Sequence, residues 1–215
     1  MIVNTSAIVL KSFSYGESSL IARCFSKKNG KVSLIIKGAK KNKSPKAPYF
    51  QPLSYVDIIY NHKLNRDLQV LSKVNFRQYW SKILDDLYKV SLAISILELT
   101  DKTMSDNDPH PSLFLILKEV LKAFNNTLID PKILFWFYEC ALLNNLGFQP
   151  NLEDPKLPGL VLPNIKNDSN CVVVLSTLLS GNINQLQKIK VSKETSSLIS
   201  HYLWSLIDYH FEGLS

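Results

Sequence analysis

The sequence predicts an α+β protein in which a small N-terminal β-barrel of five strands is followed by an all-helical C-terminal domain. Short β-branched and aromatic runs separated by turn residues occupy the first 77 residues, and helical spacing of apolar residues takes over from about Gln78. The crowding of lysine into the first 50 residues also separates the two parts. We therefore expect two domains, at residues 1–77 and 78–215.

The barrel prediction depends on five apolar runs, which span residues 7–10, 20–25, 32–36, 55–60 and 68–71. Asn29-Gly30, between the second and third runs, is a strong hairpin signal because both positions accept a positive φ. The long lysine-rich connection after the third run suits a closed barrel of the oligonucleotide-binding (OB) type. An SH3-like barrel is the structural alternative.

The helical domain is predicted from stripes of apolar residues. The face that the first helix should bury comprises Ile83, Leu87, Val90, Ile94 and Leu97. A second helix should begin at Pro111, where a further stripe starts. The apolar spacing therefore predicts two amphipathic helices before residue 125.

The third helix carries the clearest boundary signals. Asp130 should cap it, Pro131 should occupy its first position, and Gly147 should stop it. Residues 133–138 are apolar on every side, so this helix should be central in its domain. Residues 151–170 should then form a loop, residues 172–175 a short strand, and a last helix should begin near Ser192.

The net charge of +7 is distributed very unevenly. Residues 1–50 contain ten bases and one acid, Glu17, whereas the rest of the chain contains 15 bases and 17 acids. Such asymmetry is typical of a surface that binds nucleic acid or an anionic membrane, and the alternative is a merely solubilising lysine face. We favour nucleic acid.

Residues that could carry covalent chemistry are sparse. Cys24, Cys140 and Cys171 lie far apart, and no histidine has metal-binding spacing. Adjacent acids such as Asp85-Asp86 lack the converging carboxylates that two-metal nucleases need. We therefore expect no enzyme, metal or cofactor. Since no apolar run could span a membrane and the first ten residues do not resemble a secretion signal, we expect a cytoplasmic protein.

The basic residues of the barrel are the candidate DNA contacts. They are Arg23, Lys27, Lys28, Lys31, Lys37, Lys40, Lys41, Lys43 and Lys46. Aromatic residues beside them could stack on bases, above all Tyr15, Tyr49 and Phe50, with Phe13 and Phe25 as further candidates. Because lysine is a point charge without a fork that reads base edges, binding should be largely independent of base sequence.

Several short motifs together resemble the RecO family. In the barrel they are Tyr15-Gly16-Glu17-Ser18, Asn29-Gly30-Lys31, Lys37-Gly38-Ala39-Lys40-Lys41 with Ser44, and Gln51-Pro52-Leu53. Farther along, residues 142–150 (LLNNLGFQP) are similar to the family's "LxxLGFxP" helix end. Each motif is short, and their order and spacing along most of the chain make the resemblance specific.

The resemblance implies a nucleoid-associated DNA repair protein that binds single- and double-stranded DNA and anneals complementary strands. The implied protein partners are RecR, the C-terminal tail of single-strand-binding protein (SSB) and, indirectly, RecA, which is loaded onto SSB-coated DNA. The resemblance also places the segment from Lys37 to Lys41 on the protein surface that contacts DNA. Many members carry a four-cysteine zinc module after the GFxP segment. Residues 149–170 contain no cysteine here, so we expect a zinc-free member with residues 151–170 replacing that module.

Two other functions fit the sequence. The aromatic-rich helical domain could bind a partner peptide, making the protein an adaptor whose DNA affinity is incidental. The barrel could also bind RNA, since OB folds accept both nucleic acids.

Overall fold

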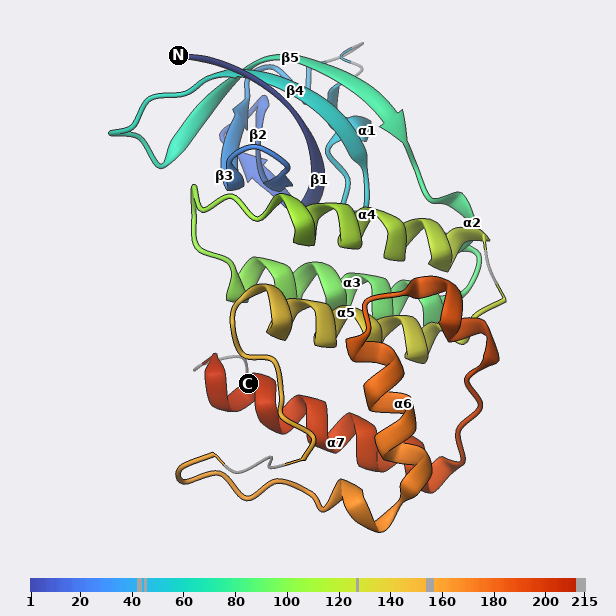
Figure 1. Cartoon of the computed structure of the whole chain (residues 1–215). Helices are drawn as coiled ribbons and strands as arrows, with labels where there is room; N and C mark the ends of the chain where they lie inside the picture. The colour runs from blue at the N-terminus through green and yellow to red at the C-terminus, as the bar shows by residue number, and fades with distance from the viewer. Residues whose placement is uncertain (42–43, 45, 127, 154–156, 212–215) are drawn as a thin grey trace. The chain divides into compact units, whose positions relative to one another are not determined.

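The computed structural model describes all residues except 42–43, 45, 127, 154–156 and 212–215 (Figure 1). The chain forms two compact units, Met1–Asn125 and Asn126–Ser215. Helices before residue 126 belong with the barrel because α3 (Leu87–Thr103) packs on β1 and β2. The domain boundary expected at residue 77 stays a prediction.

The first unit contains a closed five-stranded barrel, as predicted. Its strands are β1 (Ile2–Tyr15), β2 (Ser19–Ser26), β3 (Gly30–Ile36), β4 (Tyr55–Asn61) and β5 (Leu68–Gln78). They pair in the order β1-β2-β3-β5-β4, and all neighbours are antiparallel except β3 and β5. A short helix, α1 (Lys46–Tyr49), lies between the third and fourth strands. This arrangement is an OB-type barrel.

Alternation along the strands builds the barrel core. In β3, Val32, Leu34 and Ile36 are buried whereas Ser33 and Ile35 are half-buried, as expected for a strand with one face inward. β1 and β5 are longer than the apolar runs predicted, continuing to Tyr15 and Gln78. Strand pairing uses backbone groups, so it extends through the polar residues that ended the sequence signal.

Two further helices, α2 (Ser81–Leu84) and α4 (Pro111–Asn126), complete the first unit. The start of α4 at Pro111 confirms the prediction. Ile83 and Leu97 are buried as predicted for the first helix, but the prediction was wrong for Leu87, which is 84% exposed, and Ile94, which is 38% exposed. Ala93 and Ile96 are buried instead. The cause is a break at Asp86, whose side chain caps α3, so that Ile83 belongs to a separate short helix. No single periodic face therefore runs across residues 83–97.

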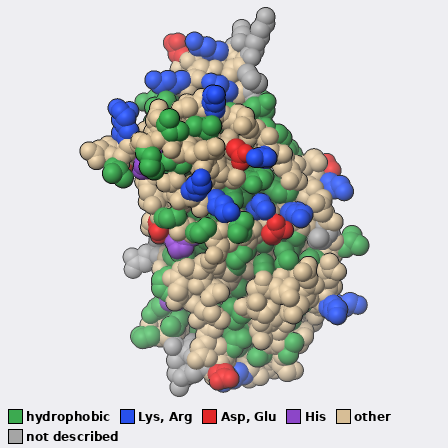
Figure 2. Space-filling view, turned by 45° about the horizontal axis from the view of Figure 1, so that its top comes forward, with side chains coloured by type: hydrophobic (Ala, Val, Ile, Leu, Met, Phe, Trp, Pro, Cys, Tyr) green, Lys and Arg blue, Asp and Glu red, His purple; other side chains and the backbone are tan. Residues whose placement is uncertain are grey.

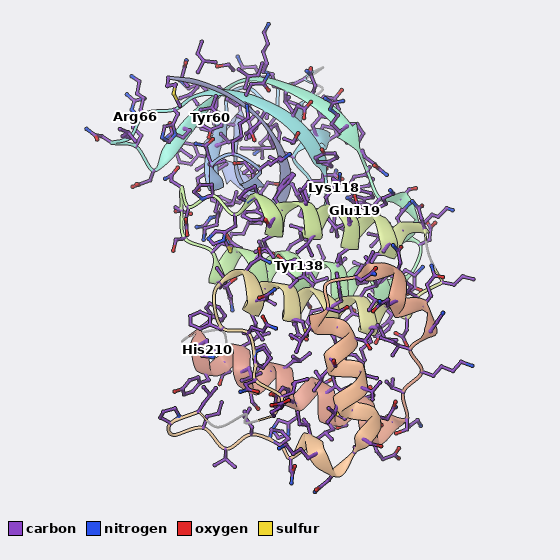
Figure 3. All side chains as sticks on the ribbon, viewed as in Figure 1. Tyr60, Arg66, Lys118, Glu119, Tyr138 and His210 are labelled. Carbon is purple, nitrogen blue, oxygen red and sulfur yellow. The ribbon has the colours of Figure 1, made fainter. Side chains whose placement is uncertain are left out.

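The second unit contains α5 (Pro131–Asn145), η1 (Ile165–Asn167), α6 (Ser169–Leu179), η2 (Ile183–Lys188) and α7 (Lys193–His210). Asp130 caps α5 by accepting a hydrogen bond from the Lys132 amide at 2.8 Å, and Gly147 follows the helix with φ +85°. All but one of residues 133–138 are buried, which confirms that α5 is central. At the end of α7, His210 stacks on Phe148 with 4.2 Å between ring centroids (Figure 3).

The strand predicted at residues 172–175 was wrong, because these residues lie within α6. Asp168 caps this helix by accepting hydrogen bonds from the amides of Asn170 and Cys171. The buried residues, Cys171, Val174, Leu175 and Leu178, have helical spacing. Burial and capping therefore override the β propensity of three consecutive valines. In the described part of the chain, no helix combines the length and apolarity needed to cross a membrane.

Candidate nucleic-acid interface

The predicted basic residues fall into three groups rather than one. Arg23 and Lys31 pair with carboxylates, Lys27 and Lys28 lie at the tip of the β2–β3 hairpin, and the others follow β3. We call Lys37, Lys40 and Lys41 the strand-end group. All three follow the last residue of β3, and all three are exposed. Lys46, at the start of α1, is half-buried. Lys43 lies outside the described residues.

The carboxylate-paired residues face acids that come from far along the chain. Lys31 is 7% exposed in its side chain, and its Nζ donates a hydrogen bond to the Asp101 backbone carbonyl at 2.6 Å. Arg23 lies 3.3 Å from the Asp101 carboxylate and 3.5 Å from that of Asp106. Lys11 also contacts Asp101, at 2.7 Å. Burial and these acids leave the Lys31 ammonium group no room for a phosphate, which argues against its predicted role as a DNA contact.

The hairpin-tip lysines are remote from the strand-end group. The register pairs Ser26 with Gly30 at one end of the hairpin and Leu20 with Ile36 at the other. At about 3.3 Å per residue, the two ends of β3 lie roughly 20 Å apart. Figure 2 likewise shows basic side chains at several separate places on the upper part of the visible face, with acidic side chains among them. The eight candidates that the structure describes therefore do not form one continuous cradle.

The strand-end group is held against the β1–β2 turn. The chain turns at Gly38, where φ is +68°, and the Lys40 amide then donates a hydrogen bond to the Ser18 carbonyl at 2.9 Å. The Lys40 Nζ lies 3.3 Å from the Ser14 hydroxyl, to which it donates. This anchoring brings the exposed cations beside Tyr15, which is 51% exposed. A basic loop and an open aromatic ring therefore share one edge of the barrel.

The outer face of β1, β2 and β3 continues from this edge. The register places Phe13 opposite Ile21, and Ile21 opposite Ile35. Residues opposite each other in neighbouring strands point to the same side, so these three form one cross-strand row. Phe13 is 47% exposed and, being two residues from Tyr15 along β1, lies on the same side. We call the strand-end group together with Phe13 and Tyr15 the candidate interface.

The other aromatic candidates are less available. Phe50 is fully buried in the barrel core, which contradicts its suggested role in stacking on bases. Phe25 is buried too, with its ring 6.1 Å from that of Phe114. Tyr49 is half-buried and stacks at 5.4 Å on Phe76, a 41% exposed residue that the sequence reasoning missed. Phe76 lies in the part of β5 beyond the predicted strand, so no sequence signal singled it out.

The thiol inside the barrel is not a reactive group. Burial raises the pKa of the Cys24 thiol to about 12, which keeps it protonated and unreactive. Among the described residues, His, Cys, Asp and Glu side chains form no group of three that could hold a metal ion. The chemistry that the candidate interface offers is binding through charge and aromatic rings.

An OB-type barrel with a basic, partly aromatic outer face, joined to a helical unit, defines a class of nucleic-acid-binding protein. Comparison with protein families gives the particular one. The model described as "Recombination protein O N terminal" matches residues 1–80, and "Recombination protein O C terminal" matches residues 84–155. The chain belongs to the RecO family of DNA repair proteins, which confirms the resemblance seen in the motifs.

Curated relatives carry the same family name. The chain is 32% identical to the DNA repair protein RecO of Salinibacter ruber over 71% of its length, and 32% identical to that of Exiguobacterium sibiricum over 75%. The matched regions span only 58% and 64% of those two relatives. A third, from a Thermoanaerobacter strain, is 28% identical over 99% of this chain and 95% of its own length.

Proposed function

We propose that this protein is a recombination mediator that binds single- and double-stranded DNA and anneals complementary strands. The observation that carries the proposal is the candidate interface, in which a group of three lysines lies beside two exposed aromatic rings on an OB-type barrel. Its activity would be binding rather than covalent catalysis. Family membership supports a role in DNA repair.

The mechanism rests on charge neutralisation. Ammonium groups of the strand-end group contact phosphates and displace counterions, which lowers the repulsion between two DNA strands held near one another. Phe13 and Tyr15 stack on bases of a single strand, each contributing about 1–3 kcal/mol. Stacking accepts any base, so it holds a strand without selecting its sequence and leaves base edges free to pair.

A charge reversal tests the proposal. The triple variant Lys37→Glu, Lys40→Glu, Lys41→Glu should lose affinity for a fluorescein-labelled oligothymidine by at least about 100-fold, measured by fluorescence anisotropy, since several phosphate contacts become repulsive. Folding should be retained because none of the three side chains belongs to the buried core. Retained circular dichroism with unchanged affinity would refute the assignment of this surface.

A matched control makes the same change in net charge elsewhere on the barrel. Lys63, Arg66 and Lys73 are exposed residues of β5 and the β4–β5 loop, and Figure 3 shows Arg66 at the tip of that loop. Reversing these three to glutamate should reduce affinity much less than reversing the strand-end group. Equal losses would mean that binding responds only to net charge.

A groove in the second unit favours a peptide partner as well. It has a volume of about 620 Å³ between α6 and η2, and its lining includes the apolar Val173 and Ile189 with the basic Lys188 and Lys190. No acid occurs among the described lining residues. A C-terminal tail ends in a carboxylate, so apolar and cationic lining together suit it. We propose that the SSB tail binds here, which makes the adaptor role part of the same protein.

Binding of the tail is tested with a synthetic SSB C-terminal peptide. Calorimetric titration should detect binding to the full chain and a loss of at least tenfold in affinity for Lys188→Glu, Lys190→Glu. The exposed Lys193, just beyond the groove, provides a control by reversal to glutamate. Binding that is unaffected by the double variant would place the tail elsewhere.

The remaining family functions are proposals of the same kind. We propose that the protein acts with RecR and helps RecA to load onto SSB-coated DNA in the cytoplasm, and the test is a RecA-loading assay with and without RecR. An RNA-binding role is the alternative for the barrel, since its lysines do not distinguish a ribose from a deoxyribose. Competition between oligothymidine and oligouridine for the candidate interface discriminates between the two.

A further inference from the structure

One end of the outer barrel face carries a compact cluster of opposite charges, which we call the Asp106 cluster. Its members are Lys11, Arg23, Lys31, Asp101 and Asp106. The three bases come from the first three strands, and the acids come from α3 and the loop after it. Three cations against two carboxylates leave one positive charge in excess. The cluster is therefore attractive to a further anion.

The cluster has a fixed part and an open part. Lys31 and Asp101 are each 7% exposed in their side chains, and Lys31 is additionally tied to the Asp101 backbone. Lys11, Arg23 and Asp106 have side chains that are 51%, 28% and 49% exposed. Lys31 and Asp101 cannot separate, because each would then be a buried charge without an opposite charge beside it. The three open side chains can exchange partners with a ligand.

Asp106 is held in the cluster by two long contacts, one to Arg23 and one to Lys31, whose Nζ lies 3.6 Å from the Asp106 carboxylate. Arg23 Nη2 lies 3.5 Å from the Asp106 carboxylate, which is beyond the usual length of a charge-assisted hydrogen bond. The Arg23 Nε is 3.3 Å from Asp101 and buried, yet it has no hydrogen-bond partner among the described residues. A guanidinium held so loosely is available to a better acceptor, and a phosphate offers two oxygens that match its planar fork.

The position of this cluster extends the candidate interface. Lys11, Arg23 and Ser33 are opposite one another in the register, so they form the row next to that of Phe13, Ile21 and Ile35. Adjacent rows on one side of a sheet are two residues apart, or roughly 7 Å along the strand. A strand stacked on Phe13 would thus pass its next phosphate close to Lys11 and Arg23.

We propose that Lys11 and Arg23 form an additional phosphate site at the end of the interface, and that the Asp106 carboxylate occupies it as an intramolecular competitor. A nucleic-acid phosphate must displace Asp106 from Arg23 to extend onto this row. Asp106 thereby limits the length of strand that is bound and weakens the hold on DNA. This inference rests on the proposed DNA-binding function of the barrel.

Removing the competitor tests the proposal. In Asp106→Asn the affinity for labelled oligothymidine should rise about two- to fivefold, the range expected when one exposed ion pair no longer opposes binding. The salt dependence should also steepen by about 0.7 in the slope of log K against log salt, because one more phosphate is neutralised. Both quantities come from anisotropy titrations of the full chain.

Asp108→Asn is the matched control. Asp108 lies in the same loop, is 55% exposed and pairs with His110 rather than with the cluster. Its substitution removes the same charge from the same loop, so a general electrostatic effect would appear equally in both variants. The gain from Asp106→Asn should also vanish when Lys11 and Arg23 are both changed to glutamine.

The outcomes separate this inference from the proposed function. Equal affinities and slopes for Asp106→Asn and Asp108→Asn, or a weaker Asp106→Asn, would overturn the competitor role even if the wild type binds DNA. A wild type that does not bind oligothymidine at all would instead defeat the proposed function. If circular dichroism shows Asp106→Asn to be unfolded, Asp106→Ser, which also removes the carboxylate, serves for the same comparison.

Discussion

Glu139 is an acid at the centre of an apolar helix. Its side chain lies within α5 and is buried, and loss of water around the carboxylate raises its pKa from 4.5 to about 8. Near neutral pH the folded protein therefore holds this group mainly as the uncharged acid. The sequence showed an apolar run, and only the packing of α5 revealed that the acid following the run is enclosed as well.

The raised pKa of Glu139 predicts how stability depends on pH. Between pH 4.5 and about 8 the folded state retains a proton that the unfolded state has released, so the free energy of unfolding should fall as pH rises through this window. The slope attributable to this group is at most about 1.4 kcal/mol per pH unit. Urea denaturation of Glu139→Gln should lack this slope and show a more stable protein at the alkaline end.

A control for this experiment is Glu98→Gln, which alters an acid whose side chain is 64% exposed on α3. Its pH dependence should match that of the wild type. A slope that persists in Glu139→Gln would assign the effect to other groups.

The β2–β3 hairpin contacts the α3–α4 loop through backbone atoms. Gly30 has φ +62°, and a Cβ atom there would overlap the backbone carbonyl of Asp108 in the α3–α4 loop. Beside it, the Asn107 amide donates a hydrogen bond to the Lys31 carbonyl at 2.9 Å. The glycine predicted for its turn geometry is thus also required for close approach of the loop that carries Asp106.

Substitution of Gly30 should therefore lower the free energy of unfolding by more than the strain of a left-handed backbone alone. Gly16→Ala is the matched control, since Gly16 has φ +58° and no atom lies within 4 Å of the position that a Cβ would take. That control should lose about 1–2 kcal/mol from its left-handed backbone alone. Gly30→Ala should lose clearly more in urea denaturation, because the hairpin and the loop must separate. Equal losses of stability in the two variants would show that the α3–α4 loop can move away from residue 30 without destabilising the protein.

At the scale of the whole molecule, the net positive charge counted in the first 50 residues is larger than the charge that any one surface presents to DNA. Asp101 and Asp106 neutralise part of it, and of the other described cations Lys27 and Lys28 lie at one end of β3 whereas the strand-end group lies at the other. The number of lysines that one DNA strand can meet is consequently smaller than the sequence total suggests.

This distribution predicts a moderate salt dependence of DNA binding. If three to five cations act together, the slope of log K against log salt for a single strand should lie between about −2 and −3.5, whereas nine would give about −6. Anisotropy titrations of oligothymidine over a range of salt concentrations measure the slope. A value near −6 would mean that the separated groups bind one strand jointly.

The sequence by itself determined the barrel strands, most of the helices and their order along the chain. Alternating runs and the Asn29-Gly30 turn predicted the barrel strands, Asp130-Pro131 and Gly147 bounded α5, and the motifs indicated the family. These features are local, since hydrogen bonding within a turn or a cap depends on neighbours in the chain. Where a local preference competed with packing, as for the valines of α6, the local reading failed.

Only the tertiary structure decided which candidate residues stay available to a ligand. Lys31 and Phe50 looked like Lys37 and Tyr15 in the sequence, yet one is enclosed beside Asp101 and the other fills the barrel core. Asp101 is 70 residues from Lys31, and charge pairing over such a separation leaves no trace in composition or spacing. Availability depends on what packs against a side chain, and that is set by contacts between distant parts of the chain.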